Sequence, residues 1–193
     1  DLSENTSLNL KMQKSKSVCW VVGTKLITAY DQPALGAVYK IVSIEDDQGV
    51  MHDTIKLSNN AEKVSTPGKK QVWRITSRAK GKSEGDYITF AGTDVNALEE
   101  INMFHPTYTY INKTVRDFDA VPLLVPIYDK GQLIYDLPSL DEIKNYATKE
   151  LDELWNEYKR VLNPQDYPVD LAKDVWDNKM ALIDNVRKKA HNF

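Results

Sequence analysis

The chain has 193 residues, of which 41% are apolar and 27% charged, and its formal net charge is −3. This composition supports a buried core and argues against a disordered chain or a general binder of nucleic acid or anionic membranes. No apolar run approaches the roughly 18 residues of a membrane-spanning helix, and the start of the chain lacks both a signal-peptide pattern and an initiator methionine. The single cysteine, Cys19, excludes an internal disulfide and fits a reducing cytoplasm.

The beginning of the chain predicts a helix and then a buried strand. Ser3 is a suitable N-cap for a helix over residues 3–15. Residues 18–22 are apolar and rich in β-branched side chains, as is typical of a buried strand. We therefore expect Cys19 to be a buried, unreactive thiol, and the strand to end at Gly23.

The middle of the chain predicts strands joined by short turns. The expected strands cover residues 37–44, 51–57, 72–77, 87–90, 121–128 and 132–135, with loops at 30–36, 45–49, 67–68 and 79–86. Pro122 and Pro126 favour a sheet edge for their strand, because proline cannot donate a ladder hydrogen bond. Asp46 and Asp47 precede a glycine in a hairpin, where aspartate forms turns, so we interpret them as turn residues rather than metal ligands.

The last third predicts helices. Ser139 and Glu142 form a capping-box pattern, which begins a helix that Asn163-Pro164 ends. Asp170 is the expected cap of a second helix. The residues expected to face inward are Leu140, Ile143, Ala147, Leu151, Leu154, Tyr158 and Val161 in the first helix and Leu171, Val175, Leu182, Ile183 and Val186 in the second, with Trp155, Trp176 and Met180 as helix core.

A candidate phosphate site follows the first predicted strand. Gly23 would let backbone N–H groups approach a phosphate closely, and the hydroxyl of Thr24 would add a donor. In α/β barrels, phosphate sites are often built from loops after the late strands. A strand that ends in Gly-Thr is also an ordinary turn, and the pattern alone does not decide between the two.

The remaining polar residues give weaker signals. His52, His105 and His191 share no metal-ligand spacing, so no metal site is predicted, and the ring of His105 is expected to bond backbone in a turn. A basic stretch surrounds Trp73 and comprises Lys63, Lys69, Lys70, Arg74, Arg78, Lys80 and Lys82. It could hold single-stranded nucleic acid, a polyphosphate or an acidic surface, but we favour a solvated hairpin face and no nucleic-acid partner.

Several ordered segments carry a family resemblance. They are residues 22–36 (VGTKLITAYDQPALG), 53–58, 63–70, 83–87, 103–106, 137–140, 158–160, 167–171 and 176–180. Together they resemble the C-terminal portion of bacterial nicotinate phosphoribosyltransferases over nearly the whole chain. The resemblance implies an α/β enzyme, α+β in this piece. Residues 1–30 would end an irregular phosphoribosyltransferase barrel, 31–136 would form a β-hairpin-rich region, and 137–193 would form C-terminal helices.

The resemblance also implies a reaction. Enzymes of this family join nicotinate to phosphoribosyl pyrophosphate in NAD biosynthesis, and ATP hydrolysis through a phosphohistidine drives the step. ATP and Mg are expected for the intact enzyme, with neither bound by this chain alone, and the partner would be an N-terminal portion or a second subunit. Gly23 and Thr24 match the loop that holds the substrate phosphate.

Three departures from the family pattern matter. The family usually has an acidic residue at the position of Val18 and glycine at the position of Val21, and the added bulk at the latter could close the phosphate loop. The phosphohistidine and nicotinate-binding regions lie upstream in the family, and neither His52 nor His105 matches the phosphorylated position. We therefore predict no catalytic residue here and no activity for the isolated chain. The alternative is a non-catalytic scaffold of the same ancestry.

Overall fold

A computed structural model describes residues 2–34, 36–60, 63–108 and 110–191. The chain divides into two compact units, Asp1–Tyr39 and Lys40–Phe193, and each is described by itself. The division that the sequence predicts at residues 30 and 136 stays a prediction. Within the described part, no helix combines the length and apolarity needed to cross a membrane.

The first unit contains two helices, α1 (Glu4–Met12) and α2 (Thr24–Ile27). The hydroxyl of Ser3 accepts a hydrogen bond from the backbone N–H of Thr6 at 3.2 Å, which confirms the predicted N-cap. Neither helix buries a residue, because the apolar side chains of this unit lack a covering layer among the residues described.

The predicted buried strand at residues 18–22 is wrong. These residues form neither helix nor strand, and the side chains of Val18 and Val21 are 98% and 86% exposed. A strand is stable only beside a hydrogen-bonding neighbour, and no described segment pairs with this one. Cys19 is consequently exposed, which contradicts the expected buried thiol.

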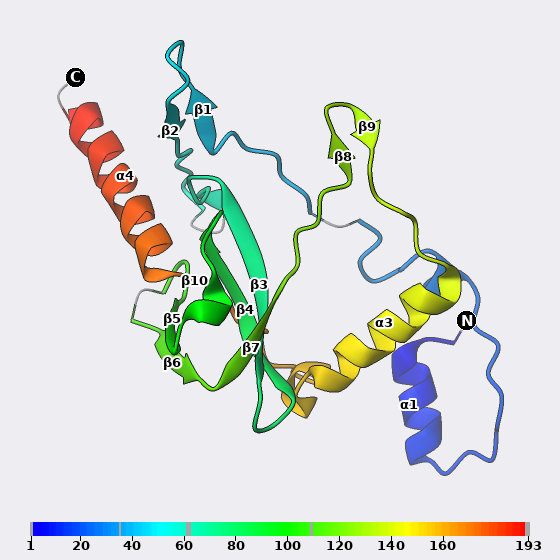
Figure 1. The fold of residues 1–193 in the computed structure, drawn as a ribbon. Coiled ribbons are helices and arrows are strands. Elements are labelled where there is room, and N and C mark those ends of the chain that lie inside the picture. Colours follow the sequence, from blue (N-terminus) through cyan, green and yellow to red (C-terminus); the bar gives the residue numbers. More distant parts are fainter. Residues whose placement is uncertain (1, 35, 61–62, 109, 192–193) are drawn as a thin grey trace. The chain divides into compact units, whose positions relative to one another are not determined.

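A six-stranded sheet organises the second unit (Figure 1). Its strands are β3 (Lys70–Ser77), β4 (Lys82–Phe90), β5 (Glu100–Phe104), β6 (Asn112–Arg116), β7 (Phe118–Pro122) and β10 (Val169–Leu171). The order is β6-β5-β10-β4-β3-β7, and β10 runs parallel to β4 and antiparallel to β5. Two small hairpins lie outside this sheet, β1 (Ser43–Glu45) with β2 (Met51–Asp53) and β8 (Tyr128–Asp129) with β9 (Gln132–Leu133).

The β3–β4 hairpin confirms the predicted alternation on β3 but corrects the predicted loop at 79–86. Strand β4 already begins at Lys82, so the turn is much shorter. Ile75 pairs with Gly85 and Thr76 pairs with Ser83, which leaves one extra residue in a β-bulge. Gly85 adopts φ +134° at the bulge, a conformation that other residues rarely take. Because glycine is also typical of loops, its presence made this part of the strand resemble a loop in the sequence.

The other hairpins are shorter than predicted. The strands expected at 37–44 and 51–57 pair only over β1 and β2, while Asp46 closes their turn by accepting backbone hydrogen bonds from Gln48 and Val50 at 2.9 Å. The turn at Lys130-Gly131 is confirmed between β8 and β9. The strand predicted at 121–128 is wrong over residues 123–127, which form no strand, but β7 ends at Pro122 and lies at the sheet edge that this proline favours.

The helices begin and end differently from the prediction. α3 (Leu140–Glu153) has the predicted capping box of Ser139 and Glu142, but it stops ten residues before Asn163, and a 3-10 turn (η3, Asn156–Lys159) follows. α4 covers Lys173–His191. Asp170 was expected to cap this helix, which is wrong: it lies buried in β10, because that strand is inserted between β4 and β5.

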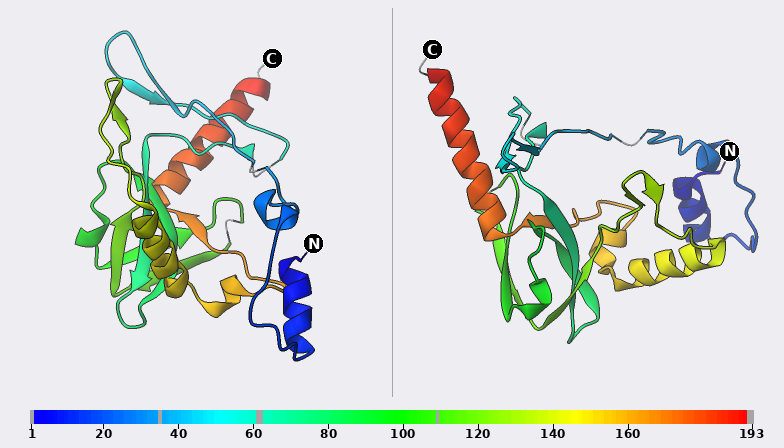
Figure 2. Two further views of the ribbon diagram at one scale, coloured as in Figure 1. Left: turned by 90° about the vertical axis from the view of Figure 1, so that its right-hand side faces the viewer. Right: turned by 45° about the horizontal axis from the view of Figure 1, so that its top comes forward.

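The core of the second unit lies where the curled sheet meets the start of α4 (Figure 2). A short 3-10 turn, η2 (Val95–Ala97), adds one apolar side chain. The buried apolar residues are Ile75, Tyr87, Val95, Ile101, Met103, Val115, Phe118, Ala120, Leu171, Ala172 and Val175. Trp176 of α4 stacks on Phe104 with ring centroids 5.9 Å apart, whereas the predicted inward face of α3 includes Leu140 and Leu151, both exposed.

Candidate functional site

The predicted phosphate-binding corner lies at the start of α2. Gly23 is the N-cap residue, with φ −131° and ψ −118°, and Thr24 is the first helical residue. The first N–H groups of a helix have no acceptor within the helix, so they can bind an anion. Gly23 is half-buried and Thr24 is exposed, so the hydroxyl is accessible.

A cavity of about 440 Å³ lies beside this corner within the first unit. Val22 and Lys25, on either side of Gly23 and Thr24, line it. Residues of α1, including Ser7, also contribute to the lining. The exposed side chain of Val21 is not among the lining residues, so it does not fill this cavity.

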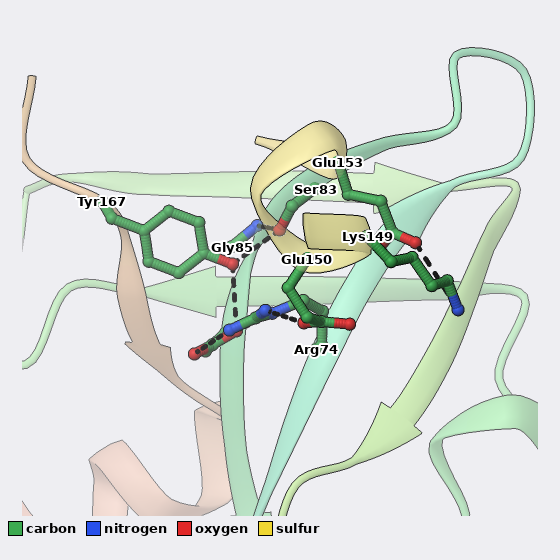
Figure 3. Close-up of polar contacts among 8 residues, drawn as sticks. Arg74, Ser83, Gly85, Lys149, Glu150, Glu153 and Tyr167 are labelled. Carbon is green, nitrogen blue, oxygen red and sulfur yellow. Dashed lines mark hydrogen bonds and ion pairs between the residues drawn. The ribbon is translucent and has the colours of Figure 1, made fainter. Parts of the chain in front are cut away.

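Arg74 is the centre of a polar network in the second unit (Figure 3). Its Nε donates to Asp86 Oδ1 at 2.9 Å and its Nη2 donates to Oδ2 at 3.3 Å, while Nη1 donates to Glu150 of α3. These carboxylates raise the pKa of the guanidinium, with the Asp86 hydrogen bond as the largest cause. The network joins β3, β4 and α3.

Tyr167 extends this network toward β10. Its hydroxyl donates to Asp86 Oδ1 at 3.0 Å and accepts from Ser83, 2.6 Å away, whose own oxygen accepts from the N–H of Gly85 (Figure 3). Burial raises the pKa of Tyr167 to about 12, so the phenol stays protonated and remains a donor near neutral pH. The arrangement fixes the segment that leads into β10.

The basic stretch is largely occupied by contacts within the second unit. Lys82 Nζ donates to the carbonyl of Asp152 at 2.6 Å, at the C-terminal end of α3, where a cation is stabilised by the helix dipole. Lys80 lies over the ring of Trp155, 5.3 Å from its centroid. The predicted solvated face is therefore wrong at Arg74, whose side chain is only 19% exposed, and two members of the stretch, Arg74 and Lys82, contact α3.

His105 and Lys179 meet at a second cavity, of about 520 Å³. The Nδ1 of His105 accepts from the backbone N–H groups of Thr107 and Tyr108 at 3.0 and 2.9 Å, which confirms the predicted turn. Lys179 is only 5% exposed, and its Nζ donates to the carbonyl of Pro106 at 3.3 Å. Among the described residues, no group of three or more His, Cys, Asp or Glu side chains is arranged to hold a metal ion.

Sequence patterns alone missed both of these arrangements. Arg74 and Asp86 are partners because they are opposite each other in the β3–β4 register, which could be inferred only after recognising that β4 starts at Lys82. No role was predicted for Lys179 from the sequence. No local signal distinguishes it, because its burial depends on the loop at residues 104–108.

Comparison with known proteins gives a consistent result. The family model described as nicotinate phosphoribosyltransferase C-terminal domain matches residues 69–179. The chain is 51% identical over 189 residues to nicotinate phosphoribosyltransferase of Bacillus subtilis strain 168, covering 98% of this chain and 38% of the relative. It is 30% identical over 187 residues to the mouse enzyme of that name, covering 96% and 33%.

A solved structure supports the same relationship. The crystal structure of human nicotinic acid phosphoribosyltransferase aligns with a TM-score of 0.56 and 28% identity, over 62% of this chain and 24% of that one. The mixed α+β fold is therefore one shared with a phosphoribosyltransferase. The chain belongs to the nicotinate phosphoribosyltransferase family, and it spans between a third and two fifths of the length of the two curated relatives above.

Proposed function

We propose that this chain is the C-terminal part of a nicotinate phosphoribosyltransferase of NAD biosynthesis. The intact enzyme would form nicotinate mononucleotide and pyrophosphate from nicotinate and phosphoribosyl pyrophosphate, coupled to ATP hydrolysis. The observation that carries the proposal is the 51% identity to the Bacillus subtilis enzyme over almost the whole chain. A cytoplasmic location accompanies it, as the single cysteine suggests.

The contribution of this chain would be to bind the substrate phosphate rather than to react with it. Gly23 and Thr24 would hold the phosphate through backbone N–H groups and one hydroxyl. The corner supports this role because it begins a helix, carries an exposed hydroxyl and lies beside a cavity. ATP and Mg²⁺ would be held by the remainder of the intact enzyme, with no ligand from this chain.

The first unit would complete its fold only against the remainder of the enzyme or a second subunit. Val18, Val21 and Leu26 are exposed, and α1 and α2 bury no residue. Apolar surface of this kind is stabilised when another chain segment covers it. We therefore expect the isolated chain to have no transferase activity.

A chimera tests the proposal directly. This chain would replace the matching C-terminal part of the Bacillus subtilis relative, and pyrophosphate release would be measured with and without nicotinate and ATP. We expect nicotinate-dependent turnover in the chimera and none in the isolated chain. A folded chimera without turnover would instead support the non-catalytic scaffold.

Variants of the chimera then test the phosphate corner. Thr24→Val should raise the KM for phosphoribosyl pyrophosphate about tenfold, as expected for a lost hydrogen bond to a charged group, and leave the KM for nicotinate unchanged. Ser17→Ala is the matched control, since its hydroxyl is exposed and upstream of the corner. Equal constants in all variants would remove Gly23 and Thr24 from the site.

A further inference from the structure

Lys179 is a buried cation that has no carboxylate partner among the residues the structure describes. Its side chain comes from α4, is 5% exposed, and donates a hydrogen bond to the carbonyl of Pro106. Burial lowers the pKa of Lys179, and no acidic residue in the described part of the chain offsets that effect. A buried ammonium group is costly unless an anion or several acceptors compensate it, so this position favours an anionic ligand.

His105 supplies a second donor at the same cavity. Because two backbone N–H groups point at Nδ1, this nitrogen must carry the lone pair, and the neutral ring therefore has its proton on Nε2. Among the described residues none accepts a hydrogen bond from Nε2, although the buried carboxyl of Asp170 interacts electrostatically with His105. The turn at His105 thus fixes both the tautomer and the position of an available N–H donor.

The lining provides further hydroxyl groups. Thr66 and Tyr108 lie in the same cavity as His105 and Lys179, from three separate segments of the second unit. The ring of Tyr108 packs against that of His105 with centroids 4.8 Å apart, which holds the phenol at the cavity wall. One cation and three neutral groups able to donate at a single cavity suit a ligand with several anionic oxygen atoms, such as a phosphate group.

We propose that the cavity lined by Lys179, His105, Tyr108 and Thr66 binds the phosphate group of a small molecule. Asp166 is the one acidic residue among those that line it, and it is exposed, so water and salt screen its repulsion of an anion. Asp170 of β10 interacts with His105 from outside the lining, and burial raises the pKa of its carboxyl, which favours the neutral form. Lys179 is shielded from this screening by its burial. The site goes beyond the proposed transferase function and does not depend on catalysis by the chain.

An NMR titration of the complete 193-residue chain tests this site. Inorganic phosphate would be added at constant ionic strength, with chloride as the balancing anion. We expect saturable shifts of the amide signals of Thr107 and Tyr108, which bond the His105 ring. Acetate should give no saturable shift, and an equal response to acetate would overturn the phosphate assignment.

Three variants separate this site from general anion binding. Lys179→Met keeps the length of the side chain and should weaken phosphate binding by about tenfold or more, since a charged hydrogen bond is lost. Lys188→Met, on the exposed part of the same helix, should leave binding unchanged. If the Lys179 variant unfolds, Tyr108→Phe serves instead, because it keeps the ring and should weaken binding about fivefold. No saturable shift in the unsubstituted chain, or equal affinity in the folded variants, would overturn the proposal.

Discussion

Arg74 and Asp86 lie directly opposite each other on β3 and β4, and two hydrogen bonds of 2.9 and 3.3 Å join their side chains. This bidentate pairing fixes the guanidinium, which then reaches Glu150 of α3 with its remaining nitrogen. Both side chains of the Arg74–Asp86 pair are less than a fifth exposed. The pair therefore determines where a helix attaches to the sheet.

Removing this guanidinium should destabilise the second unit. Arg74→Met leaves the carboxylates of Asp86 and Glu150 without their cation, and we expect a loss of about 2–3 kcal/mol in the free energy of unfolding, measured in urea. Arg74→Lys should recover only part of it, because lysine cannot make the bidentate contact. Arg78→Met is the control: Arg78 pairs with Asp119 in an exposed position, and less than about 1 kcal/mol should be lost. Similar losses for both arginines would contradict this assignment.

Gly85 should not tolerate a side chain. Its φ is +134°, and a Cβ atom would lie 2.8 Å from Cγ and 2.9 Å from the carbonyl oxygen of Pro168. We expect Gly85→Ala to cost more than about 2 kcal/mol, combining backbone strain with the clash. Gly131→Ala has positive φ but open space around it, and should cost about 1 kcal/mol. Chemical denaturation of both variants separates the two effects, and equal costs would rule out the clash.

The capping box should control the beginning of α3. Ser139→Ala removes the side-chain cap and should destabilise the helix start by about 1 kcal/mol, visible as faster amide exchange of its first turns. Hydrogen bonds from Ser139 lower the pKa of Glu142 below its ordinary 4.5. The stabilising effect of the Glu142 carboxylate should thus be complete above pH 4.5 and disappear as the pH falls through the lowered pKa of Glu142. Thr148→Ala, in the exposed middle of α3, is the control and should leave amide exchange in the first turns of the helix unchanged.

Two tyrosines should titrate late. Burial raises the pKa values of Tyr87 and Tyr167 to about 12, above the ordinary 10.0. The folded state then keeps protons that the unfolded state loses. The contribution of the two protonated phenols to the free energy of unfolding is therefore present below pH 10 and is lost as the pH rises toward about 12. Phenolate absorbance should show a late step, which Tyr87→Phe and Tyr167→Phe each reduce.

Local patterns predicted the features that depend on neighbouring residues. The caps at Ser3 and Ser139, the turn at Asp46 and the backbone-bonded ring of His105 all follow from contacts within five residues. The alternation of side chains predicted β3, and toward the end of this strand every second side chain is buried. These interactions need no knowledge of the rest of the fold.

Features that depend on distant segments could not be predicted in the same way. The apolar run at 18–22 has the composition of a buried strand, yet it is exposed where no described segment pairs with it. Asp170 resembles a helix cap but becomes a buried strand residue because β4 and β5 accept it between them. Gly23 and Thr24 were predicted as site residues through the family resemblance, and their role stays a prediction. Lys179 became a candidate only when its burial was visible.

The insertion of β10 has a consequence for how the protein is made. Three residues, Val169–Leu171, bridge β4 and β5, and so connect the β3–β4–β7 half of the sheet to the β5–β6 half. A ribosome delivers those two halves long before it delivers their connector. The nascent second unit therefore has two unpaired strand edges until Val169–Leu171 is made, and a polypeptide that stops before residue 169 would lack the strand that pairs with both β4 and β5.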